Sequence, residues 1–134
     1  MSIATRWPVL ITVDLTASEI DSDGHASDAA IERVFGEARQ VYLRECESLR
    51  EQTLEVLRTD IRRGDSRVTP RGVTVATGVV EIFPEAFVMN ARIRGRDDGE
   101  LVADATCTLT TGGELPVACR DEFIARAHNA RHSH

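Results

Sequence analysis

The residues best suited to chemistry lie in one acidic segment, Glu19-Ile-Asp-Ser-Asp-Gly-His-Ala-Ser-Asp28. An amphipathic pattern begins directly after it, so the segment is expected to lie at the start of a helix. A carboxylate in that position lies beside unpaired backbone N–H groups, which can stabilise a developing oxyanion. Asp21 could then attack an acyl carbonyl or activate water as a general base.

Two other interpretations of this acidic segment stay open. Asp, Ser and Gly form turns readily, and Ser27 or Asp28 can cap a helix, so a solvated turn explains part of the pattern. The segment also follows an EF-hand-like spacing from Glu19 onward, which would make it a calcium loop. That match is incomplete, because Ala30 stands where the loop needs a bidentate acid and the preceding residues alternate like a strand.

A long helix is expected from about residue 27 to about residue 49. Its apolar residues recur at spacings of three and four, and they include Ile31, Val34, Phe35, Ala38, Val41, Tyr42 and Leu49. Gly36 lies inside this helix and lowers its propensity by roughly 1 kcal/mol relative to Ala, which a closely packed neighbour would explain.

Alternating apolar and polar residues predict the strands. We expect them at 9–16, 53–62, 73–80, 87–94 and 102–109, with bulges in the second and near residues 78–80. A continued helix would also fit 53–62. Asp98-Gly99 predicts a hairpin turn.

The C-terminal region is expected to add an edge strand through residues 115–119, because Pro116 cannot donate to a central ladder. A short helix is expected from about Asp121, and the tail from about residue 128 to residue 134 is expected to be disordered. One long helix against a twisted antiparallel sheet is an α+β arrangement, in which the sheet should curl around the helix.

Composition narrows the classes of function. The 134 residues suit one domain, and the net charge of −6 argues against nucleic-acid binding. No apolar run approaches the roughly 20 residues of a membrane span, and the N-terminus lacks the layout of a signal peptide. The three cysteines are far apart and odd in number, which favours buried reduced thiols. We therefore expect a cytoplasmic protein that binds neither nucleic acid nor membrane.

The acidic segment and the Glu37-Ala-Arg-Gln-Val-Tyr-Leu43 stretch together resemble hot-dog-fold acyl-CoA thioesterases of the 4-hydroxybenzoyl-CoA thioesterase type. Their motif reads D-x-D-x-x-G-H-V-N-N-A, and an E-A-R-x-x-Y-L helix follows at the same distance. Gly99-Glu-Leu-Val-Ala-Asp-Ala105 is similar to the hairpin and strand of that family. The resemblance extends from about residue 9 to about residue 109.

This resemblance implies a hot-dog fold, in which five or six antiparallel strands wrap one central helix. It implies a homodimer, often paired into a tetramer, with sites at the subunit interface. Asp21 falls on the catalytic carboxylate of the motif, and Gly24 and His25 match its G-H pair. His25 and Asp28 would orient the loop or the substrate. Glu19 departs from the motif, as do Ala26, Ser27 and Asp28, which replace V-N-N.

The activity implied is hydrolysis of an acyl-CoA thioester to a free acid and CoA, without a metal or cofactor. Asp21 would act as nucleophile or general base, and backbone N–H groups around residues 24–29 would polarise the carbonyl. Arg62, Arg63 and Arg67 are the candidate partners of the CoA phosphates. The alternatives are a non-catalytic hot-dog protein that binds acyl thioesters and a calcium-binding loop protein.

Overall fold

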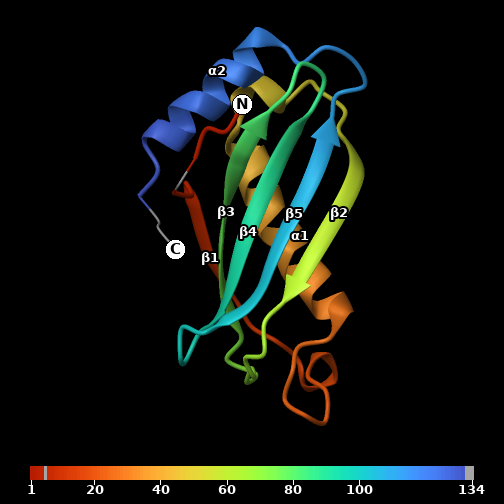
Figure 1. Cartoon of the computed structure of the whole chain (residues 1–134), viewed down its shortest axis with the longest axis vertical. Helices are drawn as coiled ribbons and strands as arrows, with labels where there is room; N and C mark the ends of the chain where they lie inside the picture. Colours follow the sequence, from red (N-terminus) through yellow and green to blue (C-terminus); the bar gives the residue numbers. More distant parts are fainter. Residues whose placement is uncertain (5, 132–134) are drawn as a thin grey trace.

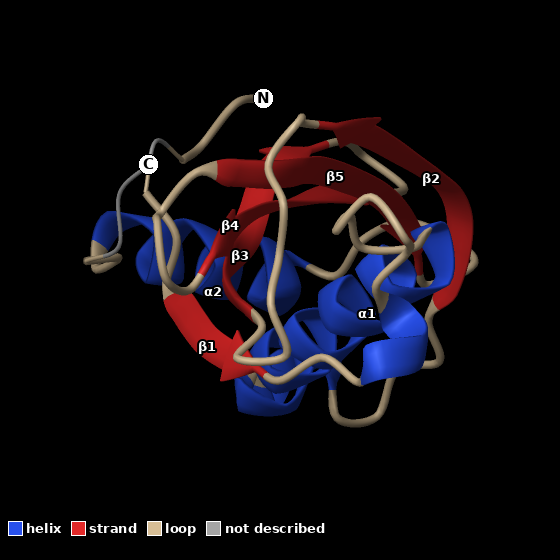
Figure 2. Cartoon of the chain, turned by 90° about the horizontal axis from the view of Figure 1, so that it is seen from below, coloured by secondary structure: helices blue, strands red, loops and turns tan. Residues whose placement is uncertain are grey.

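The computed structural model describes residues 1–4 and 6–131 (Figure 1). Its five-stranded antiparallel sheet has the order β1-β3-β4-β5-β2. The strands are β1 (Val9–Val13), β2 (Glu55–Arg63), β3 (Val73–Ile82), β4 (Phe87–Gly95) and β5 (Leu101–Thr110). Helix α1 (Asp28–Glu45) lies in the concave face of the curved sheet, as Figure 2 shows from below. This architecture is the expected α+β hot-dog arrangement, with five strands.

Helix α1 begins where the sequence predicts and ends earlier. Ser27 is its N-cap, and the Ser27 side chain accepts a hydrogen bond of 3.1 Å from the Ala30 N–H. The helix ends at Glu45 because Cys46 leaves the helical region, and a separate 3₁₀ turn, η2 (Glu47–Leu49), follows. The face turned to the sheet consists of Ala30, Ile31, Val34, Phe35, Ala38 and Tyr42, all buried.

The expected bulges are present in the sheet. The register of β2 against β5 shifts between Val56 and Arg58, and that of β3 against β4 shifts between Val79 and Glu81. Strand β1 ends at Val13, short of the predicted residue 16, because Thr16 caps a second 3₁₀ turn, η1 (Ala17–Glu19). That turn delivers the chain into the acidic segment.

The expected edge strand at residues 115–119 is wrong. Pro116 instead precedes a 12-residue helix, α2 (Val117–His128), which starts earlier than the short helix expected near Asp121. Leu115, Cys119 and Phe123 are spaced by four residues and are all buried, and the Phe123 ring lies 4.6 Å from that of Phe87. Apolar residues with this spacing share one helical face, so they outweigh the strand signal of a single proline.

The C-terminal tail predicted from about residue 128 stays a prediction. His128 is the last residue of α2, and residues 132–134 lie outside the described residues. No helix in the described ranges is long and apolar enough to cross a membrane.

Edge strand β2 is the least covered part of the sheet. None of its nine residues is buried, and Val56 and Leu57 are 45% and 56% exposed. By contrast, β3, β4 and β5 each bury most of their residues. The β2 edge ends at Arg63, next to the start of α1, so this uncovered strand borders the acidic segment.

Candidate active site

The acidic segment folds into a compact loop between η1 and α1. The Asp21 N–H donates to the His25 carbonyl over 2.8 Å, and the Gly24 N–H donates to the Asp21 carbonyl over 3.0 Å. Gly24 has a φ of +83°, a conformation that glycine adopts without strain. The Gly24 carbonyl accepts from the Val68 N–H over 2.8 Å, so the loop before β3 supports this turn from behind.

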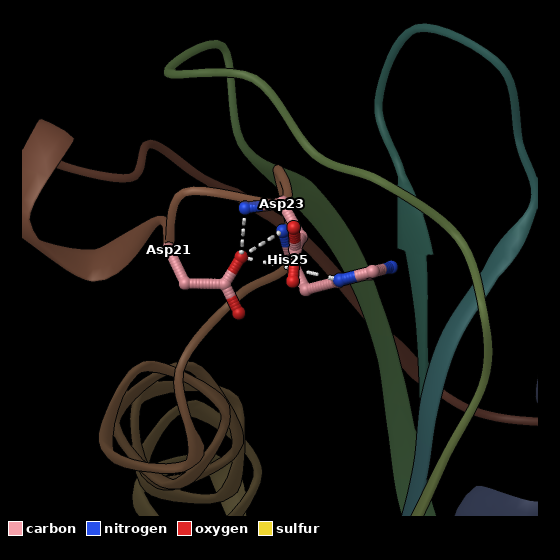
Figure 3. Close-up of side chains that lie close together, drawn as sticks. All are labelled: Asp21, Asp23 and His25. Atoms are coloured by element: carbon pink, nitrogen blue, oxygen red, sulfur yellow. Dashed lines mark hydrogen bonds and ion pairs between the residues drawn. The ribbon is translucent and has the colours of Figure 1, made fainter.

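The two carboxylate oxygens of Asp21 differ in their hydrogen bonding. Its Oδ1 accepts backbone N–H bonds of 2.9 Å from Asp23 and from His25 (Figure 3). Its Oδ2 accepts no hydrogen bond from the described residues. These bonds, led by that from the His25 N–H, lower the pKa of the half-exposed Asp21 below its ordinary value, although desolvation opposes them. Asp21 is therefore an ionised carboxylate with a free oxygen.

The start of α1 supplies hydrogen-bond donors beside this carboxylate. Of the donors expected between residues 24 and 29, the N–H groups of Gly24, His25 and Ser27 are already bonded within the loop. The Asp28 and Ala29 N–H groups, in the first turn of the helix, have no acceptor within the described part of the chain. They are the open donors that a helix N-terminus offers to an anion.

Arg63 joins the acidic loop from the end of β2. Its Nη1 lies 2.5 Å from Asp28 Oδ1, and its Nη2 donates to the Ala26 carbonyl. Arg63, Asp21, His25 and Asp28 line one open hollow on the surface. The structure thus brings Asp21, His25 and Asp28 together with one predicted phosphate ligand, whereas Gly24 shapes the loop without lining the hollow.

The other two predicted phosphate ligands lie elsewhere. Arg62 lies in a hollow on the outer face of the sheet, which it shares with Arg58 and Asp104. The stem of Arg67 packs beside Gly24, in a different hollow that it shares with Asp98 and other residues. The three arginines therefore do not converge on one group, and their role toward CoA stays a prediction.

Glu19 holds the loop to α1 through a residue that sequence reasoning missed. Arg33 donates to Glu19 from Nε over 2.7 Å and from Nη2 over 2.8 Å, and its Nη2 also donates to the Asp14 carbonyl over 2.9 Å. The bonds from Arg33 to the Glu19 carboxylate, followed by the bond from the Thr16 N–H, lower the pKa of Glu19 to about 2. Helical periodicity places Arg33 on the polar face of α1 but does not indicate its partner in the loop.

Three side chains of the loop could hold a cation. The Asp21, Asp23 and His25 side chains offer ligand atoms within 4.8 Å of one another. Glu19 does not belong to this group, because its carboxylate is committed to Arg33. The Ser27 hydroxyl is likewise committed to the helix cap. The set of ligands expected for an EF-hand-like loop is therefore not assembled.

Comparison with solved structures defines the class of fold. A Thermus thermophilus thioesterase complexed with coenzyme A and zinc has a TM-score of 0.78 and 22% identity, covering 91% of this chain and 96% of its own. A probable thioesterase from Escherichia coli has a TM-score of 0.73 and 17% identity, with coverages of 88% and 98%. A 1,4-dihydroxy-2-naphthoyl-CoA thioesterase from Synechocystis has a TM-score of 0.66 and 12% identity, with coverages of 87% and 94%.

These likenesses show that the chain has the hot-dog fold. No protein-family model matches the chain, and no curated protein matches its sequence significantly.

Proposed function

We propose that this protein is an acyl-CoA thioesterase, which hydrolyses an acyl-CoA thioester to a free acid and CoA. The observation that carries the proposal is that an ionised Asp21, with an open Oδ2, lines the same hollow as Asp28 at the start of α1, where N–H groups have no acceptor among the described residues. The hot-dog fold of solved thioesterases supports it. The presence of coenzyme A in one of those structures supports a CoA thioester as the substrate class.

The proposed chemistry assigns a role to each group. The Asp28 and Ala29 N–H groups donate hydrogen bonds to the thioester oxygen and stabilise the negative charge that develops on it. Asp21 Oδ2 either attacks the carbonyl carbon or removes a proton from the attacking water. In both routes the C–S bond breaks, the thiol leaves as CoA, and water supplies the new carboxylate oxygen. Gly24 and His25 shape the loop that holds Asp21.

A second copy of the chain is proposed to complete the site across β2. Exposed strand edges readily pair with another strand, and Val56 and Leu57 leave an apolar face open on this edge. Since β2 ends at the site through Arg63, a partner on this edge would enclose the substrate. We propose a homodimer, which could pair further into a tetramer. We also propose a cytoplasmic location, which the three free buried cysteines support.

The test is thioester hydrolysis across a panel of aliphatic and aromatic acyl-CoAs, followed by thiol release. Asp21→Asn is compared with Asp23→Asn, a matched control that removes one charge from the same loop. We expect turnover by the wild type and the control. No turnover of any acyl-CoA, with measurable acyl-CoA binding, would favour a non-catalytic binding protein instead. Loss of activity in EDTA would show that the loop uses a cation.

A further inference from the structure

We infer that Arg63 is a positioning residue for the proposed hydrolysis, which fixes the start of α1 and the loop before it, and not a ligand of the CoA phosphates. The inference rests on the proposed function. Arg63 makes two contacts with successive parts of the site: Nη1 with the Asp28 carboxylate and Nη2 with the Ala26 carbonyl. Together these contacts bridge the acidic loop and the first turn of the helix.

The backbone at the end of β2, which carries Arg63, is held by contacts with β5. Gly64, the next residue, donates from its N–H to the Val102 carbonyl over 2.8 Å. A side chain at Gly64 would collide with the Leu101 carbonyl, so the backbone of β2 and β5 approach closely there. Arg63 therefore reaches the loop from a fixed strand end. The rest of β2 is an exposed edge, and Arg63, its last residue, lines the hollow of the site.

The charge of Arg63 has a second effect at the site. Asp28 is the first residue of α1, and its carboxylate would repel an oxyanion bound at the Asp28 and Ala29 N–H groups. The guanidinium of Arg63 offsets that charge. Arg63 also adds a smaller contribution to the lowered pKa of Asp21, alongside the backbone bonds described above. Two guanidinium nitrogens already contact the Asp28 carboxylate and the Ala26 carbonyl, so a phosphate would compete with these contacts.

The first experiment compares Arg63→Gln with wild type on two substrates, an acyl-CoA and the same acyl group on N-acetylcysteamine, which has no phosphate. We expect kcat to fall about 10- to 100-fold on both, as loss of a positioning contact does, with KM for acyl-CoA within about twofold. Arg63→Lys should recover only part of the rate, since a single ammonium lacks the planar, two-pronged geometry by which Arg63 contacts both the Asp28 carboxylate and the Ala26 carbonyl. Arg120→Gln, which removes the same charge from α2 at the opposite end of the molecule, should match wild type.

Asp28→Asn provides a second comparison. If Arg63 acts partly through Asp28, Arg63→Gln should lose less activity in the Asp28→Asn background than in wild type. A loss confined to acyl-CoA, with a raised KM and no effect on the N-acetylcysteamine substrate, would identify a phosphate ligand and overturn the inference.

Amide hydrogen exchange separates this inference from the proposed function. If the wild type hydrolyses no thioester, the proposed function fails, but positioning still predicts faster exchange in Arg63→Gln at the hydrogen-bonded amides of Ser27, Ala30 and Ile31. The increase should be at least about tenfold and local, with unchanged exchange in β3 and β4. Unchanged exchange at these three amides would overturn the positioning role whatever the activity.

Discussion

The contact between Glu19 and Arg33 gives a quantitative prediction about the loop that carries Asp21. Two charge-assisted hydrogen bonds of 2.7 and 2.8 Å join the carboxylate to the guanidinium. Glu19→Gln keeps the shape of the side chain and removes the charge. Arg33→Gln removes the other partner, and the double variant completes a cycle that isolates the pair.

The expected coupling free energy is about 1 kcal/mol. Exposed ion pairs contribute about 0.2–1 kcal/mol, whereas hydrogen bonds to charged groups contribute about 1.5–3 kcal/mol when shielded. The Glu19 side chain is 17% exposed and that of Arg33 is 39% exposed, so solvent screens the pair in part. With a urea slope of about 2 kcal/mol/M, the coupling alone corresponds to roughly 0.5 M in the unfolding midpoint. Arg33→Gln should lose more than this, because it also removes the bond to the Asp14 carbonyl.

The pH dependence follows from the lowered pKa of Glu19, which is about 2 against an ordinary 4.5. A carboxyl whose pKa is lower in the folded state stabilises the fold above its unfolded value, and that stability is lost as pH falls. The difference between wild type and Glu19→Gln should therefore be full at pH 7 and shrink as pH falls from about 4.5 toward 2. A coupling below about 0.3 kcal/mol at pH 7, or a difference that grows on acidification, would refute this reasoning.

Three further predictions concern the fold and the site. Gly72→Ala should destabilise the protein by roughly 3 kcal/mol in urea unfolding, because its φ is +87° and a Cβ would overlap the Val13 carbonyl oxygen. Gly112→Ala, with a φ of +91° but open space, should lose only about 1–2 kcal/mol, and equal losses would contradict the steric argument. Phe123→Ala should cost about 3–5 kcal/mol in the same assay, because its buried ring packs against Phe87; a loss under 1 kcal/mol would mean that α2 is not part of the core. The acid limb of kcat/KM should lie below the ordinary range of an aspartate, since the backbone bond from His25 lowers the pKa of Asp21, and an acid limb above that range would assign the ionisation to another group.

Local patterns were enough to predict most of the fold. Alternation predicts four of the strands, whereas 53–62 also fits a continued helix and is favoured as a strand by its Thr, Val and Ile residues. Breaks in the alternation predict the bulges at Val56 and Val79, because one extra residue reverses every later side chain. The C-terminal helix starts at Val117 and not near Asp121 as expected, because Pro116 precedes a helix here and does not mark an edge strand. Pro116 stops a strand but readily precedes a helix, so both signals were present.

The sequence predicts only those parts of the candidate site that are formed by residues close together in the chain. The turn from Asp21 to His25 is made within five residues, so residue types and spacing could indicate it. The contacts of Arg33 and Arg63 with the loop span 14 residues or more along the chain. Their partners depend on where η1 meets α1 and where β2 ends, which sequence periodicity does not fix. Arg63 was accordingly grouped with Arg62, although adjacent residues of a strand point to opposite faces.

The rate of thiol release at saturating acyl-CoA is the measurement that tests the central claim most directly. Wild type and Asp21→Asn should be compared after equal urea midpoints show that both are folded. If Asp21 Oδ2 is the nucleophile or base, the substitution should lower kcat by about 10²- to 10⁴-fold, with acyl-CoA binding retained. An Asp21→Asn variant that turns over acyl-CoA as fast as wild type would contradict the account.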